Sequence, residues 1–325
     1  MEKLIRVDNI KKYFPAEKSF FGKPISFVKA VDGLTFDIYR GETLGIVGES
    51  GCGKSTAGRV ILRLLEATEG KVYFEDEDIF AYSKAQLKAL RRKMQIIFQD
   101  PYSSLNPKLT VLDLIGDAMQ EHKMGTKKEI EERAEELLVQ CGLNGRYLRR
   151  YAHEFSGGQR QRIGIARALA LNPDFIVCDE PVSALDVSVQ AQVINLLEDL
   201  QAEKKLTYLF ISHDLSVVKH ICNRIGVIYL GSMMELADKE ELFAHPLHPY
   251  TRSLMSVIPI PDPTIKVERI LLEGDIPSPS NPPSGCKFHT RCPYATERCK
   301  EEVPEFREVS GHHYVACHYA EKLAK

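Results

Sequence analysis

The fold of this chain of 325 residues is decided by the stretch Gly48-Glu49-Ser50-Gly51-Cys52-Gly53-Lys54-Ser55-Thr56. It fits the pattern G-x4-G-K-S/T, in which a glycine-rich loop cradles phosphate groups. An apolar run, Thr43-Leu44-Gly45-Ile46-Val47, comes directly before it and has the composition of a buried strand. From Ser55 the pattern turns helical, with Val60, Ile61, Leu64 and Leu65 on one face. This strand–loop–helix context predicts an α/β protein that binds the phosphate chain of a nucleotide.

Each residue type in the loop has a chemical task. Glycines let successive backbone N–H groups turn toward phosphate oxygens, and the helix that follows points its positive end at them. Lys54 adds a mobile positive charge for the β- and γ-phosphates, and the Ser55 hydroxyl is a hard oxygen ligand for magnesium. The alternative is a chance glycine loop, against which the flanking strand and helix argue.

Two further apolar runs have the pattern of buried parallel strands whose carboxyl ends carry function. They are Phe175-Ile176-Val177-Cys178 and Leu209-Phe210-Ile211, and each ends in polar residues. Asp179 is the expected magnesium-side carboxylate, and Glu180 is a candidate general base for water. An Asp-Glu pair at a strand end could also cap a helix, but the phosphate loop upstream favours the catalytic interpretation.

The remaining sequence predicts short strands, one amphipathic helix and a boundary. Residues 1–45 favour short strands joined by turns, among them 4–7 and 34–38, and residues 127–141 favour a helix with a charged, solvated face. Proline at high density cannot continue a helix or a central strand, so we expect a domain boundary near residue 256. The prolines concerned are Pro259, Pro261, Pro263, Pro277, Pro279, Pro282 and Pro283.

Composition excludes several classes of protein. The chain is 44% hydrophobic and 27% charged, as is usual for a globular protein, and its formal charge of −2 argues against a nucleic-acid binder and a disordered acidic tail. No stretch approaches the roughly 20 apolar residues that cross a bilayer. Charges at the N-terminus occupy the place where a signal peptide needs an apolar core. We therefore expect a cytosolic protein whose membrane partners, if any, are other subunits.

The eight cysteines are unevenly distributed along the chain. Cys286, Cys292, Cys299 and Cys317 crowd its last forty residues, and in a reducing compartment such a cluster favours metal over disulfides. Their spacing lacks the paired knuckles of structural zinc, and all-cysteine ligation also suits an iron–sulfur cluster. Three interpretations stay open: iron–sulfur, zinc with a histidine replacing one cysteine, and no metal. A metal would help a proline-rich segment with few apolar residues to stay folded.

The segment Phe155-Ser156-Gly157-Gly158-Gln159 resembles the signature sequence of ATP-binding cassette (ABC) proteins. Other motifs of that family follow in their expected order: Gln99 resembles the Q-loop glutamine, Ser183-Ala184-Leu185-Asp186 the D-loop, His213 the switch histidine, and Tyr13 the aromatic that stacks on adenine. The resemblance covers about residues 1–255. It implies an α/β P-loop NTPase with a RecA-like core, an antiparallel β-subdomain and an α-helical subdomain at about 100–165.

The resemblance also implies roles for these residues. Two ATPase subunits would meet head to tail, so that each ATP lies between one phosphate loop and the partner's signature, here Ser156, Gly157, Gly158 and Gln159. Ser55, Gln99 and Asp179 would serve magnesium, and Glu180 would polarise the attacking water. His213 would contact the γ-phosphate and sense its loss.

Residues 256–325, a proline-rich linker and a Cys-rich extension, are similar to the C-terminal region of oligopeptide/dipeptide importer ATPases. Two further segments resemble the F-type ATPase subunit of these importers: the entry segment 11–32 and the stretch Gln99-Asp100-Pro101-Tyr102-Ser103-Ser104-Leu105-Asn106-Pro107. That implies a D-type ATPase partner, two permeases, an extracellular solute-binding protein and a [4Fe–4S] cluster on the four cysteines, with zinc as the alternative.

This resemblance implies an ATPase at the cytoplasmic membrane face that drives peptide uptake. Relatives also import nickel, glutathione or oligosaccharides, and the sequence names no solute. A soluble ABC ATPase acting on ribosomes or DNA would need a second cassette or a long coiled-coil insertion, and neither is present in the sequence. A redox-responsive regulator is the remaining alternative.

Overall fold

The computed structural model describes residues 2–18, 24–258, 270 and 272–323. By its internal contacts the chain divides into two compact units that are interleaved in sequence. We call residues 2–38, 43–80 and 212–325 the phosphate-loop unit, and residues 39–42 and 81–211 the helical unit. Each unit is described by itself. The sequence predicts a single domain boundary between residues 255 and 256, whereas the two units are interleaved along the chain, so the boundary stays a prediction. The prolines at 259, 261 and 263 lie outside the described residues.

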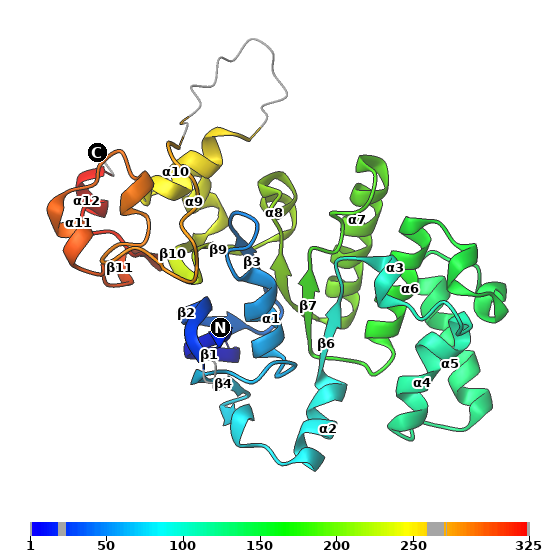
Figure 1. Ribbon diagram of the computed structural model, residues 1–325. Helices are drawn as coiled ribbons and strands as arrows, with labels where there is room; N and C mark the ends of the chain where they lie inside the picture. Colours follow the sequence, from blue (N-terminus) through cyan, green and yellow to red (C-terminus); the bar gives the residue numbers. More distant parts are fainter. Residues whose placement is uncertain (1, 19–23, 259–269, 271, 324–325) are drawn as a thin grey trace, which may run out of the picture. The chain divides into compact units, whose positions relative to one another are not determined.

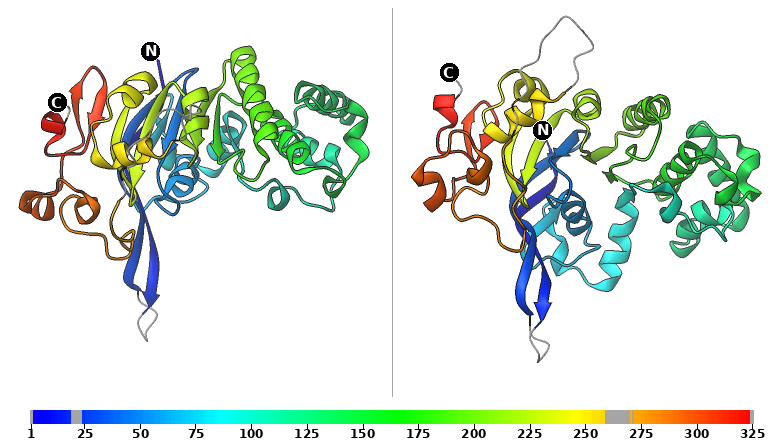
Figure 2. Two further views of the ribbon diagram at one scale, coloured as in Figure 1. Left: turned by 90° about the horizontal axis from the view of Figure 1, so that it is seen from above. Right: turned by 45° about the horizontal axis from the view of Figure 1, so that its top comes forward.

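The phosphate-loop unit contains strands of two sheets (Figures 1 and 2). The first sheet has the order β2-β1-β4-β5, with β1 and β4 antiparallel. The second runs β11-β12-β10-β9-β3 in this unit, with β3 parallel to β9 and the later pairs antiparallel. The strands are β1 (Lys3–Lys18), β2 (Pro24–Tyr39), β3 (Thr43–Val47), β4 (Glu69–Phe74), β5 (Glu77–Asp78), β9 (Arg224–Tyr229), β10 (Ser232–Asp238), β11 (Arg307–Ser310) and β12 (His313–Val315).

The helices of this unit are short. They are α1 (Lys54–Ile61), α8 (Leu215–Ile221), α9 (Lys239–Ala244), α10 (Pro249–Ser256), α11 (Glu297–Glu301) and α12 (Ala320–Leu323), with 3-10 turns η1 (Ile79–Ala81), which leads into the helical unit, and η4 (His289–Arg291). The C-terminal segment is attached by backbone pairing, because β12 adds to the edge of β10. Strands β12 and β11 therefore continue the sheet that carries β3, and β11 is labelled in the orange part of the chain in Figure 1.

The helical unit joins three parallel strands to a group of helices. Strand β7 lies between β6 and β8, and all five of its residues are buried. Helices α4, α5 and α6 pack on one another (Figure 1). The elements are β6 (Met94–Ile97), β7 (Phe175–Asp179), β8 (Thr207–Ile211), α2 (Lys84–Lys93), α3 (Pro101–Ser104), α4 (Val111–Glu121), α5 (Lys127–Gln140), α6 (Gly157–Leu169), α7 (Val187–Lys204), η2 (Gly145–Arg149) and η3 (Ala152–Glu154).

The helix predicted over 127–141 is confirmed as α5. Ile130, Ala134, Leu137 and Leu138 are buried, and the charged face lies outside. Thr126 begins the helix: its Oγ1 accepts a hydrogen bond from the backbone N–H of Glu129, and Glu129 Oε2 accepts one from the backbone N–H of Thr126. This reciprocal cap satisfies two backbone donors that would otherwise have no partner.

The predicted short strands within residues 1–45 are wrong in length. β1 and β2 are each 16 residues long and are neighbours in one sheet. Backbone pairing between them continues where the side chains are polar, so the strands extend beyond the alternating pattern that marks them in the sequence. None of the described helices is long and apolar enough to cross a membrane.

Candidate nucleotide-binding and ATPase site

The glycine-rich loop lies between β3 and α1 in the phosphate-loop unit, as the sequence predicts. Gly53, the residue before α1, has φ of 101°, and a Cβ there would lie 1.9 Å from the carbonyl oxygen of Ala30. A Cβ on Gly48 would lie 2.2 Å from the carbonyl oxygen of Ile228. Because both positions face backbone rather than movable side chains, only glycine lets the loop take this path.

Lys54 and Ser55 open α1 beside this loop. The side chain of Lys54 is buried, and its Nζ donates to the carbonyl oxygens of Gly48 at 2.7 Å and Glu49 at 3.0 Å. Its ammonium group therefore lies over the loop, where the amides at the start of α1 also favour an anion. The Ser55 hydroxyl, one position later, is the hard oxygen donor that magnesium prefers.

Tyr13 is half-buried in the same unit, and Asp32 holds it. The Tyr13 hydroxyl donates to Asp32 Oδ1, and Lys29 Nζ lies 5.7 Å from the centre of the Tyr13 ring. Burial, and then the hydrogen bond to Asp32, raise the pKa of Tyr13, so the hydroxyl stays protonated. A fixed, neutral aromatic ring of this kind suits stacking on a base.

His213 also belongs to the phosphate-loop unit and follows shortly after the end of β8 at Ile211. The backbone N–H of Ser212 donates to Ile46 in β3 at 3.1 Å, and Asp214 begins α8 by accepting from Ser216 N at 2.8 Å. His213 is held between these two anchors with its side chain exposed.

The helical unit carries the predicted hydrolytic residues. Gln99 Nε2 donates to Glu180 Oε2 at 2.9 Å, so the Q-loop residue and the candidate base are brought together. Asp179 is buried at the end of β7. Glu180 has φ of 46°, a left-handed conformation that costs free energy for a residue with a Cβ. Its amide donates to Ile211 O at 3.0 Å, and Ser183 Oγ donates to its carbonyl at 3.1 Å, which holds the strained turn.

The signature segment forms the start of α6. Gln159 N donates to Ser156 Oγ at 3.4 Å, and Gln159 Oε1 accepts from Ser156 N at 3.1 Å. A Cβ on Gly158 would lie 2.4 Å from Val189 Cγ1 in α7, so glycine permits the two helices to approach. Asp186 begins α7, and its carboxylate is exposed. The amides at the start of α6 offer a second helix N-terminus to an anion.

Sequence reasoning missed the residues that hold the site in place. Asp32 fixes Tyr13, while Tyr250 and Arg291 fix Glu49 of the loop, by a backbone hydrogen bond to the Tyr250 hydroxyl and by an ion pair to Arg291. Tyr250 and Arg291 lie 201 and 242 positions from Glu49 in the sequence. Asp32 and Arg291 fall in the entry segment 11–32 and the extension 256–325, but the resemblance of those segments assigns them no such role, and no spacing signal links them to the loop.

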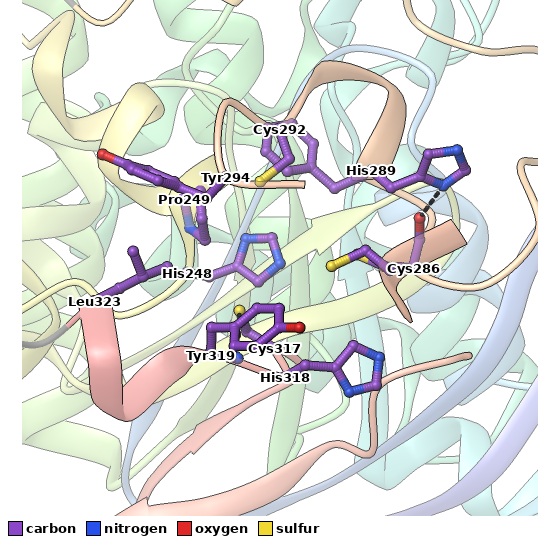
Figure 3. Close-up of a pocket in the computed structure, with 12 residues that line it drawn as sticks. His248, Pro249, Cys286, His289, Cys292, Tyr294, Cys317, His318, Tyr319 and Leu323 are labelled. Atoms are coloured by element: carbon purple, nitrogen blue, oxygen red, sulfur yellow. Dashed lines mark hydrogen bonds between the residues drawn. The ribbon is translucent and has the colours of Figure 1, made fainter. Parts of the chain in front are cut away.

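The four clustered cysteines line one pocket in the phosphate-loop unit, with His248, His289 and His318 (Figure 3). Burial raises the pKa of Cys286 to about 12 and that of Cys292 to about 11, which favours the protonated thiols. Within the described residues no three Cys, His, Asp or Glu side chains come close enough to hold a metal ion. As they lie here, the donors do not fit a [4Fe–4S] cluster or a zinc ion.

Comparisons with known proteins bear on both regions of the chain. The ABC transporter family model matches residues 31–183, and the model described as oligopeptide/dipeptide transporter, C-terminal region, matches residues 234–299. The oligopeptide transport ATP-binding protein AppF of Bacillus subtilis (strain 168) is 57% identical over 320 residues, which are 98% of this chain and 97% of AppF.

Two solved structures share the fold of the cassette. The ATP-binding cassette MJ0796, in a dimeric post-hydrolysis state bound to ADP and Pi, has a TM-score of 0.65 and 30% identity, covering 73% of this chain and 99% of that one. The protein cbiO1 from Clostridium perfringens, part of the ABC transporter complex cbiONQ, has a TM-score of 0.63 and 26% identity, covering 75% of this chain and 92% of that one.

Proposed function

This chain belongs to the ABC transporter family, among the ATP-binding subunits of oligopeptide importers, and on that premise we propose that it binds and hydrolyses ATP to drive peptide uptake. The observation that carries the proposal is the phosphate loop, with Lys54 lying over it at the start of α1. The likeness to a cassette bound to ADP and Pi supports the same chemistry.

Some of the candidate site residues bind the nucleotide, and others serve its hydrolysis. The loop amides and Lys54 hold the β- and γ-phosphates, and Tyr13 stacks on the adenine. Ser55, Gln99 and Asp179 are the oxygen donors that would hold Mg²⁺, which neutralises charge that develops on the phosphates. Glu180 orients and polarises the attacking water. His213 contacts the γ-phosphate.

A second ATPase subunit completes each ATP site. Ser156, Gly157, Gly158 and Gln159 open α6, and the positive end of a helix N-terminus suits the γ-phosphate of a partner's ATP. The related cassette MJ0796 forms a dimer. We assign the partner to the D-type subunit, which makes a heterodimer in which Asp186 lies at the interface.

Two permeases and an external solute-binding protein complete the importer. The chain lies at the cytoplasmic face of the membrane as a peripheral subunit, and its helical subdomain, about 100–165, transmits closure of the ATPases to the permeases. Peptides are the solute, because the relative AppF is an oligopeptide transport protein. Nickel, glutathione and oligosaccharides are the other solutes of this class.

Purification of the intact complex from membranes tests this assembly. A tag on this chain should recover a sister ATPase and two permeases, and vesicles containing the complex should take up peptide only with ATP and the solute-binding protein. Recovery of ribosomal proteins or DNA-repair factors instead would refute the importer assignment.

We also propose Cys286, Cys292, Cys299 and Cys317 as the ligands of a [4Fe–4S] cluster in a small Cys-rich C-terminal domain, with zinc as the alternative. Their position around one pocket supports a shared ligand, although the thiols would have to move closer together to bind it. Iron, zinc and acid-labile sulfide should be measured on anaerobically purified protein. About four iron and four sulfide per chain, lost in Cys286→Ser, would support the cluster; one zinc without sulfide would replace it by a structural zinc.

A further inference from the structure

The phosphate loop contains a carboxylate, Glu49, whose charge opposes the binding of an anion. Arg291, 242 residues later in the sequence, pairs with it in a two-pronged arrangement. Arg291 Nη1 donates to Glu49 Oε2 at 2.8 Å, and Nη2 donates to Oε1 at 3.2 Å. The side chains are 8% and 24% exposed, so water screens this pair less than a surface pair. The Glu49 charge is therefore balanced within the protein.

Glu49 is also fixed through its backbone. Its amide donates to the Tyr250 hydroxyl at 2.9 Å, and Tyr250 is fully buried. The ring of Phe288 lies 5.3 Å from that of Tyr250, and Phe288 too is fully buried. Since Phe288 and Arg291 belong to the same short segment, that segment holds both the backbone and the side chain of Glu49.

The same segment reaches the candidate adenine site through Lys287. Lys287 Nζ donates to Asp32 Oδ2 at 2.8 Å, to Ser232 Oγ at 2.7 Å and to the Leu230 carbonyl at 2.9 Å, so all three of its protons are used. Asp32 in turn accepts from the hydroxyl of Tyr13. Burial by itself would raise the pKa of Asp32, but the hydrogen bonds from Lys287 and Tyr13 lower it, which keeps the carboxylate charged.

The hairpin turn between β9 and β10 belongs to the same network of hydrogen bonds. Lys287 contacts that turn at Leu230 and Ser232, and the amide of Gly231 between them donates to the carbonyl of Cys52 in the phosphate loop at 2.9 Å. Arg291 thus contacts the loop directly at Glu49, and Lys287 acts on it through the turn at Gly231.

We propose that residues Cys286–Cys292 form a C-terminal clasp whose Arg291 and Lys287 are positioning residues for ATP. Arg291 neutralises the phosphate-loop carboxylate Glu49 and fixes the loop, and Lys287 fixes the Asp32–Tyr13 pair. Both residues would act through the residues that they hold. The clasp acts on affinity rather than on the hydrolytic step, because its side chains pair with Glu49 and Asp32, whereas the Glu180 carboxylate accepts from Gln99. The inference rests on ATP binding by the phosphate loop.

Arg291→Met tests the clasp because it keeps an unbranched apolar stem and removes the guanidinium group with its charge. We expect the dissociation constant and KM for MgATP to rise about tenfold in the full-length protein, with kcat of the complex unchanged, since two charge-assisted hydrogen bonds are lost and Glu49 is left unpaired. Arg298→Met is the matched control. It removes an exposed ion pair to Glu302 in the same C-terminal region and should leave ATP binding unchanged.

A double variant separates charge balance from general loss of structure. Glu49→Gln combined with Arg291→Met removes both charges, and it should restore most of the ATP affinity if the unpaired carboxylate causes the defect. Thermal unfolding without nucleotide accompanies each measurement. If Arg291→Met fails to fold, Arg291→Lys, which keeps the charge but loses the two-pronged geometry, should show an intermediate affinity.

The outcomes distinguish the clasp from the proposed function. Absence of ATP binding by the wild-type protein would refute the function itself. Wild-type binding that Arg291→Met leaves unchanged would refute the clasp alone. An affinity loss that the added Glu49→Gln change does not relieve would also refute it, because charge balance would not be its cause.

Discussion

Glu180→Gln should separate ATP binding from hydrolysis. The change replaces one carboxylate oxygen by an amide group and keeps the shape of the side chain. In the structure Gln99 Nε2 donates to Glu180 Oε2 at 2.9 Å, and a glutamine there still offers an oxygen to the same donor. The backbone contacts of Glu180, to Ile211 and Ser183, do not depend on its side chain. The local geometry should therefore survive.

The expected loss in kcat follows from the chemistry of the glutamine amide. It cannot accept a proton from water, so the contribution of a positioned general base, about 10²–10⁴-fold, should be lost from kcat. That corresponds to about 3–5 kcal/mol of transition-state stabilisation at 1.36 kcal/mol per tenfold. The dissociation constant for MgATP should change by less than about twofold, because the phosphate loop and Lys54 are untouched.

Phosphate release by the assembled complex at saturating MgATP measures the first quantity, and equilibrium ATP binding measures the second. Glu136→Gln is the matched control, since Glu136 is exposed in the same unit and pairs only with Arg133 among the described contacts. Wild-type turnover in Glu180→Gln would falsify the assignment of the base. Loss of ATP binding with normal folding would instead make Glu180 a binding residue.

Three further changes test the loop, the adenine site and a buried histidine. Gly53→Ala should abolish ATP binding, because its Cβ would lie 1.9 Å from a backbone oxygen, whereas Gly164→Ala meets nothing within 4 Å and serves as the control in the same assay. Tyr13→Ala should weaken ATP binding by about 1–3 kcal/mol in calorimetry, and Tyr13→Phe should keep the stacking part of that affinity while losing the hydrogen bond to Asp32. Burial lowers the pKa of His248 to about 4, so the folded state holds it neutral and the unfolded chain protonates first on acidification. The neutral histidine therefore contributes on the order of 3 kcal/mol to the free energy of unfolding, fully above about pH 6.5, and this contribution is lost as the pH falls toward 4. Unfolding curves across this range should show the loss of stability, and His248→Asn should make that loss smaller.

The buried parallel strands were predictable because burial on both faces leaves an uninterrupted apolar run. The strand predicted at 175–178 is β7, Phe175–Asp179, and the predicted helix at 127–141 is α5, Lys127–Gln140. β1 and β2 were predicted too short, because their extended parts carry polar residues such as Lys11 and Lys12 and are held by backbone pairing. Side-chain periodicity contains no record of that pairing.

The chemistry of the phosphate loop was predictable from spacing, but its supports were not. Local spacing fixes which residues face a phosphate, since one loop and one helix carry them all. The pairing of Glu49 with Arg291 joins residues 242 positions apart, in a chain with 43 Lys and Arg and 45 Asp and Glu. Any of these cations could balance Glu49 as far as the sequence is concerned, and only the folded chain selects one.

Glu49 in the phosphate loop and Asp32 beside Tyr13 are each paired with a cation from the C-terminal clasp. A carboxylate in a phosphate loop is unfavourable for anion binding unless a fixed positive charge offsets it. A cation from solvent would be mobile and screened, whereas Arg291 and Lys287 are largely buried and held by several hydrogen bonds. The Cys-rich segment therefore contributes to the electrostatics of the ATP site, and any change in its fold is expected to alter the affinity of the phosphate loop for ATP.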